Sequence, residues 1–305
     1  MEAMTEVQAA SADRPTVGYI GIGLMGRPMA LRLLKAGFPL VVWGRNPDRL
    51  RDVVDAGAVL AASPADVARA AAIVITCVSD TAAVEAVVFG PGGIAEGASV
   101  GRVLVDMSTI HPARSRAMAQ RLRQATGMGW IDAPVSGGPQ GAAAGTMAVM
   151  AGGEAVDFDF VRPVVAHLAG AFTLMGPSGA GQTTKMVNQV IVGGCKSVIA
   201  EAIQLAMNAG IDAMRLPEAF AGGRADSSLL RQSIPKMVSG DFTPTGHLRT
   251  MMKDLDIVME LARETRTPMP MTGLATEMHR MMVSHGHADD DTTSVIALLR
   301  DKPLL

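Results

Sequence analysis

The chain has 305 residues, of which 49% are apolar and 18% charged, and its formal net charge is −2. This composition supplies enough apolar side chain for a large core, so it predicts two folded domains and excludes a disordered protein. A near-neutral charge without a basic stripe argues against nucleic acid as a partner. Because no apolar run reaches ~18 residues without polar interruption, we expect no membrane span.

Residues 1–14 are small and polar, with acids and no apolar segment, which is typical of a disordered tail and not of a signal peptide. The two cysteines, Cys77 and Cys195, lie inside apolar runs without the spacing of metal ligands. We expect free, buried thiols in a reducing compartment, which indicates a cytoplasmic protein.

The first half alternates short apolar runs with helical segments. Strands are predicted at 16–20 and 39–43, and the runs 71–78 and 102–107 predict two more. Strand and helix in this alternation predict parallel βαβ units with helices on both faces of the sheet. The fold class expected for residues 15–177 is therefore α/β, a Rossmann-type doubly wound parallel sheet.

A glycine-rich turn, GIGLMG, stands between the first strand and the first helix. The G-x-G-x-x-G spacing allows a tight turn, close approach of the backbone to a pyrophosphate at the helix N-terminus, and close helix packing. A structural glycine turn is the alternative, but the position between strand and helix favours dinucleotide binding. The predicted cofactor contacts are Gly21, Ile22, Gly23, Leu24, Met25 and Gly26.

The second strand is followed by Gly44, Arg45 and Asn46, where NAD enzymes usually carry an acid for the ribose 2′-hydroxyl. An arginine without a competing carboxylate suits a 2′-phosphate. We therefore expect NADP(H) as the preferred cofactor, bound by Arg45 and Asn46, with NAD(H) as the second choice. The alternative is a solvated arginine at a strand end.

The second half is helical. After residue 177 the strand signals stop, and residues 181–210 predict one long helix. Gly193 and Gly194 lie in its middle, where each costs ~1 kcal/mol relative to Ala, which suggests close approach of another helix. The sequence therefore predicts an all-α domain over 178–305 for substrate binding and oligomerisation. Further amphipathic runs begin at Leu216, His247, Met271 and Thr293.

Two polar patterns near the middle of the chain carry candidate chemistry. Ser136 is followed by Gly137 and Gly138, and this hydroxyl with two backbone N–H groups can seat a substrate carboxylate, although a flexible loop is the alternative. Lys185 interrupts an apolar helical run, with the amides of Asn188 and Gln189 on the same helix face.

Removing an ammonium from water is costly. We therefore expect the face with Lys185, Asn188 and Gln189 to line a cleft between the domains, and not the helical core. The alternative is a lysine that extends its ammonium to solvent.

Five segments occur in order along the chain: GYIGIGLMGRPMA, DMSTIHP, DAPVSGGPQGAAAGTMAVMAGG, GAGQTTKMVNQ and MMKDLDIVMELA. Together they resemble the β-hydroxyacid dehydrogenases, the group of 3-hydroxyisobutyrate dehydrogenase and tartronate semialdehyde (2-hydroxy-3-oxopropionate) reductase. The resemblance covers residues 16–299. KMVNQ and the tail SHGHADDDTTSVIALL look most like the tartronate semialdehyde reductases. Residues 44–46 depart from the many relatives that use NAD(H).

The resemblance implies an oxidoreductase that transfers hydride between the nicotinamide and a short β-hydroxy or semialdehyde acid. It makes Lys185 the catalytic acid, because an ammonium can stabilise the developing alkoxide and donate its proton. Partial burial is expected to lower the pKa of Lys185 toward neutrality. Asn188 is expected to bind the substrate or hold the lysine, and Gln189 is a further substrate contact.

Tartronate semialdehyde reductase, giving glycerate, is the most specific expectation from this resemblance. Dehydrogenases of 3-hydroxyisobutyrate, 4-hydroxybutyrate or L-threonate are alternatives, and a non-catalytic dinucleotide-binding protein is a distant one. The expected partners are a small carboxylate substrate and further copies of the chain, as a homodimer or homotetramer.

The same resemblance implies several cofactor contacts outside the glycine-rich turn. Thr109 is expected beside the nicotinamide, and Lys253 is expected to reach the cofactor from the helical domain. Asp254 is expected to hold Lys253 or the catalytic lysine. The backbone of Cys77, Val78 and Ser79 is expected to line the adenosine side. Each of these residues has the alternative of an ordinary surface position.

The stretch HGHADDD combines two imidazoles and three carboxylates that could bind a divalent cation. Hydride transfer with a lysine acid needs no metal, and the acids also suit the N-cap and first turn of the last helix. We therefore expect a helix cap and no metal.

Overall fold

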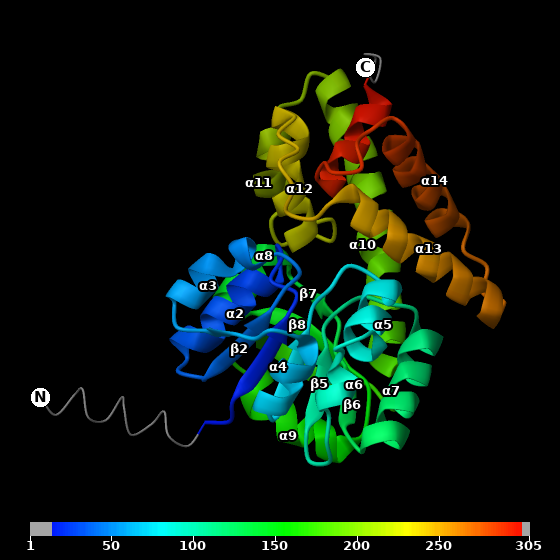
Figure 1. Ribbon diagram of the computed structural model, residues 1–305. Helices are drawn as coiled ribbons and strands as arrows, with labels where there is room; N and C mark the ends of the chain where they lie inside the picture. The colour runs from blue at the N-terminus through cyan, green and yellow to red at the C-terminus, as the bar shows by residue number, and fades with distance from the viewer. Residues whose placement is uncertain (1–13, 301–305) are drawn as a thin grey trace, which may run out of the picture. The chain divides into compact units, whose positions relative to one another are not determined.

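The computed structural model describes residues 14–300 and divides into two compact units, Met1–Lys185 and Met186–Leu305 (Figure 1). The division falls within the long helix α10 (Ala180–Asn208). Most of the predicted tail, residues 1–13, lies outside the described residues. Its last residue, Arg14, is described, and its guanidinium carbon lies 4.9 Å from the centroid of the Phe38 ring.

A six-stranded parallel sheet in the order β3-β2-β1-β4-β5-β6 forms the centre of the N-terminal unit, which confirms the predicted fold class. The four predicted strands correspond to β1, β2, β4 and β5. Two strands were not predicted: β3, which has two exposed residues, and β6, whose four residues include a glycine and an acid. The strands are β1 (Val17–Ile20), β2 (Leu40–Trp43), β3 (Val59–Leu60), β4 (Ile73–Thr76), β5 (Val103–Asp106) and β6 (Gly129–Asp132).

Helices cover both faces of this sheet because successive residues of each strand point to opposite sides. In β4, Ile75 joins one core with Met29 of α2, while its neighbour Val74 joins the other core with Leu122 of α7. The first core is covered by α2 (Gly26–Lys35), α3 (Arg51–Asp55) and α9 (Ala155–Val165). The second is covered by α4 (Pro64–Ala70), α5 (Thr81–Phe89), α6 (Ile94–Gly97) and α7 (Pro112–Thr126).

A small three-stranded sheet, β7-β8-β9, completes the N-terminal unit. These three strands were not predicted from the sequence, in which a flexible loop was the alternative for residues 136–138. Strand β7 pairs antiparallel with β8, so that Ser136 lies opposite Ala148. The elements are β7 (Val135–Ser136), α8 (Gly138–Ala144), β8 (Met147–Ala151) and β9 (Ala169–Leu174).

All assigned elements of residues 186–300 are helices, as predicted. The helix α12, which contains Pro235, was not predicted, and the final run is a 3-10 helix and not an α-helix. The elements after α10 are η2 (Ala213–Arg215), α11 (Leu216–Phe220), α12 (Ser228–Ser239), α13 (Leu248–Thr265), α14 (Pro270–Ser284) and η3 (Thr292–Leu299).

The paired glycines of α10 have different surroundings. A Cβ built on Gly193 would lie 2.9 Å from Leu255 Cδ2 of α13, so the predicted close helix approach is confirmed at this position. A Cβ on Gly194 would meet no heavy atom within 4 Å. The face of α10 that carries Gly194 is therefore open in the described part of the chain.

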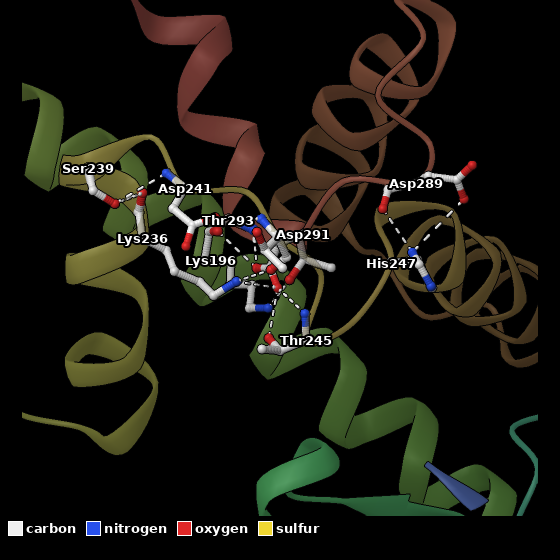
Figure 2. A network of polar contacts seen from close by, with 11 residues as sticks. Lys196, Lys236, Ser239, Asp241, Thr245, His247, Asp289, Asp291 and Thr293 are labelled. Atoms are coloured by element: carbon white, nitrogen blue, oxygen red, sulfur yellow. Dashed lines mark hydrogen bonds and ion pairs between the residues drawn. The ribbon is translucent and has the colours of Figure 1, made fainter. Parts of the chain in front are cut away.

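The buried carboxylate of Asp291 ties η3 to neighbouring segments (Figure 2). Its Oδ2 accepts hydrogen bonds of 2.7 Å from both Thr245 N and Thr245 Oγ1, and lies 3.2 Å from Lys236 Nζ. Its Oδ1 accepts from Thr293 N at 3.1 Å. Although burial raises the pKa of Asp291, these hydrogen bonds hold it well below its usual range. The expected helix cap is thus confirmed.

The exposed face of α10 contradicts one expectation and bears on a second. Cys195 is exposed and not buried. In addition, α10 is long and apolar enough to cross a membrane by length and composition, because its charges are sparse, and only 28% of its most apolar 18-residue window is buried. One such helix is weak evidence for a membrane span, since core helices of other proteins pass the same test.

Candidate active site

The carboxyl ends of the parallel strands meet at one edge of the large sheet. The strand order reverses between β1 and β4, and open α/β sheets bind ligands in the crevice at this point. Gly21 follows β1 and Cys77 follows β4. Arg45 and Thr109 follow shortly after β2 and β5. The topology therefore brings the four predicted cofactor segments of the N-terminal unit to one edge.

The glycine-rich turn has the geometry that a pyrophosphate requires. Gly21 has a φ of +101°, and a Cβ there would lie 2.2 Å from Cys77 O. A Cβ on Gly26, the first residue of α2, would lie 2.0 Å from Gly21 O. In contrast, a Cβ on Gly23 would meet nothing within 4 Å. Two glycines thus close the turn, and the third leaves the backbone open at the helix N-terminus, which fits a bound phosphate.

Arg45 and Asn46 are both exposed after β2. Asn46 Oδ1 accepts a hydrogen bond of 3.0 Å from Asp48 N and caps the short helix η1 (Pro47–Leu50). Asp48 forms an ion pair of 2.6 Å with Arg51. The acid nearest to Arg45 along the following turn is therefore engaged with another arginine.

Cys77, Val78 and Ser79 form the segment after β4. Cys77 N donates to Ile20 O at 2.9 Å, which fixes this segment beside the glycine-rich turn. Val78 N donates to Ser108 Oγ at 2.9 Å, and Ser79 Oγ donates to Asp80 Oδ2 at 2.7 Å. The sequence analysis missed Ser108, which links this segment to the loop that carries Thr109.

Two acids that the sequence analysis missed, Asp106 and Asp132, stand opposite each other at the ends of β5 and β6. Burial raises the pKa of each carboxyl to about 6. Asp132 Oδ1 accepts from Gly179 N at 2.7 Å and its Oδ2 accepts from Gln182 N at 2.9 Å, so this side chain caps α10. The available signal was an acid at the end of each apolar run, VLVD and GWID.

Lys185 lies in the second turn of α10 and is only 6% exposed. Its Nζ donates a hydrogen bond of 2.8 Å to Val135 O, directly before Ser136 in β7. Gly137 and Gly138 follow with φ values of +135° and +63°. The structure therefore places the lysine ammonium at the start of the predicted carboxylate seat. A lysine that extends to solvent does not fit this burial.

The candidate residues of the C-terminal unit form one chain of contacts. Asn188 Nδ2 donates to Gln189 Oε1 at 2.8 Å, and Gln189 Nε2 donates to Asp254 Oδ2 at 2.6 Å. Lys253 Nζ lies 3.1 Å from Asp254 Oδ1, which confirms that Asp254 holds Lys253. Gln189 is buried, and its amide is hydrogen-bonded to Asp254. A substrate would have to compete with Asp254 for this amide. The contact of Lys253 with the cofactor stays a prediction.

Comparison with known proteins decides the family. Residues 16–176 match the family model of the NAD binding domain of 6-phosphogluconate dehydrogenase, and residues 179–299 match that of the NAD-binding domain of NADP-dependent 3-hydroxyisobutyrate dehydrogenase. The chain belongs to the β-hydroxyacid dehydrogenase family. As a β-hydroxyacid dehydrogenase it is an NAD(P)-dependent oxidoreductase that acts on a hydroxy acid and uses a nicotinamide dinucleotide.

Similar β-hydroxyacid dehydrogenases have different substrates. The chain is 34% identical to 2-hydroxy-3-oxopropionate reductase of Escherichia coli, over 93% of this chain and 96% of that protein. It is 33% identical to L-threonate dehydrogenase of Cupriavidus necator, over 92% and 95%. The crystal structure of 3-hydroxyisobutyrate dehydrogenase from Salmonella typhimurium has a TM-score of 0.85 and 30% identity, over 93% of this chain and 99% of that one.

Proposed function

We propose that this β-hydroxyacid dehydrogenase reduces 2-hydroxy-3-oxopropionate (tartronate semialdehyde) to glycerate with NADPH. The observation that carries the proposal is the buried ammonium of Lys185, 2.8 Å from Val135 O and adjacent in the chain to Ser136, Gly137 and Gly138. A proton donor and a carboxylate seat are thus held on one short strand and the helix against it.

Lys185 supplies the proton in this proposal. A nicotinamide held at the glycine-rich turn would supply a hydride to the substrate carbonyl carbon, and the carbonyl oxygen would then need a proton. The Lys185 ammonium stabilises the developing alkoxide and donates that proton. Its hydrogen bond to Val135 O fixes the direction of the amine before substrate binds. Asn188, one turn further along α10, is proposed as a second donor to the substrate.

Ser136, Gly137 and Gly138 are proposed to bind the substrate carboxylate. Gly137 and Gly138 both have positive φ values in the turn that leads into α8, and successive backbone N–H groups in a turn can bind an anion. The seat is short: only one residue separates Gly137 from Val135, whose carbonyl holds the lysine. A carboxylate there presents a carbonyl one or two bonds away, which favours acids of three to four carbons.

Arg45 supports NADP(H) as the preferred cofactor. It is exposed after β2, at the position where an acid would repel a 2′-phosphate. The free thiol of Cys195 supports the further proposal of a cytoplasmic location, because such thiols persist in reducing compartments.

Other short acids remain the alternatives within the same chemistry. The similarity to an L-threonate dehydrogenase and to a 3-hydroxyisobutyrate dehydrogenase keeps those two substrates, and 4-hydroxybutyrate, on the test panel. A non-catalytic dinucleotide-binding role is disfavoured. Burying a lysine costs free energy, and a protein that only binds the dinucleotide does not need a buried ammonium.

The test measures the oxidation of NADPH and of NADH in the presence of short semialdehyde acids. The reverse reactions are measured with the matching hydroxy acids. The proposal expects the highest kcat/KM for tartronate semialdehyde with NADPH. The control is the uncharged aldehyde of the same length, which should react at least tenfold more slowly. Equal kcat/KM for the acid and its uncharged analogue would contradict the carboxylate seat.

A further inference from the structure

The first two turns of α10 and the residue before them make contacts to the edge of the large sheet and to β7. Asp132, at the end of β6, accepts backbone N–H groups of Gly179 and Gln182. One turn later, Lys185 donates to Val135 O. Between these contacts, the side chain of Gln182 reaches the loop after β5. The proton donor is thus held on a helix end that is fixed at several points within the N-terminal unit.

Gln182 is fully buried, and both ends of its amide are engaged. Its Nε2 donates to Ser108 O at 2.7 Å, and its Oε1 accepts from Ile110 N at 3.0 Å. These two backbone groups stand on either side of Thr109, so one amide holds both peptide groups that flank this residue. An amide can donate and accept at once, whereas a lysine only donates and a carboxylate only accepts.

The spacing along α10 links this amide to the catalytic lysine. Gln182 and Lys185 are three residues apart, so their side chains leave the same face of the helix. A rigid helical turn therefore connects the loop of Thr109 to the ammonium of Lys185. Asp132 fixes the position of that turn, because it accepts the backbone N–H of Gln182 itself.

We propose that Gln182 is a positioning residue, which clamps the loop around Thr109 to α10 and so sets the distance between the nicotinamide and the Lys185 ammonium. This inference rests on the proposed function, in which Thr109 lies beside the nicotinamide and Lys185 is the acid. Displacements of about 1 Å in such a geometry can cost about 10²-fold in rate.

The test compares Gln182→Leu with Gln182→Asn and with a control, Thr126→Val. Leucine has a similar size and removes both hydrogen bonds. Asparagine keeps the amide but is one methylene too short to reach both partners. Thr126 Oγ1 donates to Leu122 O at 2.8 Å and accepts from Met128 N at 3.1 Å, so the control also loses two bonds to the backbone, at the opposite edge of the sheet.

For Gln182→Leu we expect kcat to fall at least tenfold, with a smaller fall for Gln182→Asn. The Kd for NADPH should change less than threefold in both. The primary isotope effect with NADPH deuterated at the transferred position should rise, because hydride transfer becomes rate-limiting. Thr126→Val should lower Tm by a similar amount without changing kcat or the isotope effect. A Gln182→Leu enzyme with lowered Tm but wild-type kcat and isotope effect would overturn the proposal.

Amide hydrogen exchange in the cofactor-free protein gives a second readout that needs no substrate. Exchange at Ile110 N should accelerate at least tenfold in Gln182→Leu and stay unchanged in Thr126→Val. Unchanged exchange at Ile110 would overturn the clamp even if no acid on the panel is turned over. Absence of turnover by the wild type, with accelerated exchange in the variant, would instead count against the proposed substrate class.

Discussion

At the scale of single residues, the proposed chemistry depends on an ammonium that is buried but not isolated. Most of Lys185 is shielded from water, and its ammonium donates a hydrogen bond to Val135 O. A charge in such a place is costly unless it is hydrogen-bonded. A general acid also needs to be buried and held in a fixed direction. The burial that makes the Lys185 ammonium costly therefore also suits it to the proposed function.

Lys185→Ala should abolish most of the turnover. A lost general acid typically costs about 10²–10⁴ in rate. The glycine-rich turn is untouched by this change, so the Kd for NADPH should stay within a few-fold of the wild type. Steady-state kinetics and a fluorescence titration with NADPH measure the two quantities. A variant that retains wild-type kcat would show that the proton comes from another group.

Arg45→Asp should shift cofactor preference from NADPH toward NADH. The substitution removes a cation from the 2′-phosphate and adds an anion that repels it. A lost charge-assisted hydrogen bond predicts a change in the kcat/KM ratio of about tenfold or more. Arg51→Ala is the matched control, because that arginine pairs with Asp48 in the same turn. An unchanged ratio in Arg45→Asp would place the 2′-phosphate elsewhere.

At the scale of elements, α10 has two different faces. Gly193 packs against α13, whereas Gly194 faces open space. The large apolar residues Ile191, Val198 and Leu205 are each more than half exposed and stand seven residues apart. A seven-residue apolar repeat is typical of helices that pair along a seam. This face therefore favours the expected homodimer or homotetramer.

Ile191→Glu combined with Val198→Glu should break the oligomer, because carboxylates within an apolar seam repel each other and resist burial. Light scattering coupled to gel filtration should show a mass near twice or four times the chain for the wild type, and a monomer for the double variant. Val156→Glu changes a valine on α9 that is more exposed than Val198 and should leave the mass unchanged. A monomeric wild type would contradict the prediction.

At the scale of the whole molecule, stability should depend on pH through two buried acids. Burial raises the pKa of Asp106 and Asp132 to about 6. The folded protein therefore binds more protons than the unfolded chain between about pH 4 and 6. The stability that these two groups contribute is fully present below about pH 4 and is lost as the pH rises through 6. Asp291 has the opposite effect, because its pKa is lowered in the folded protein. The stability that Asp291 contributes is present above about pH 4 and is lost as the pH falls below that value.

Asp106→Asn isolates one of these groups. Asn Oδ1 can still accept from Thr76 Oγ1, which donates to Asp106 Oδ1 at 2.9 Å in the structure. The Tm of the variant minus that of the wild type should be higher at pH 7.5 than at pH 4.5 by at least about 2 °C, because only the wild type carries a buried charge at position 106 at the higher pH. Thermal unfolding at several pH values measures this difference. A difference that does not change with pH would mean that Asp106 is neutral throughout, or is solvated.

The amino-acid sequence by itself determined the alternation of strands and helices, the glycine-rich turn and the family. These features depend on local periodicity and on residue types that repeat at fixed spacing, and such signals survive without knowledge of contacts. Lys185 could also be recognised from the sequence, because it is a lone charge in an apolar helical run.

Only the tertiary structure decided which groups hold the end of α10 that carries that lysine. Asp132 and Gln182 reach their partners across 47 to 74 positions of sequence, so no local pattern indicates these contacts. The strands β3 and β7 were missed because two residues are too few for a pattern to stand out. The strands β6, β8 and β9 were missed because glycine, alanine or an acid interrupts their pattern of large apolar residues. Burial of Cys195 was wrong for a related reason: apolar neighbours along a helix do not say whether another element covers that face.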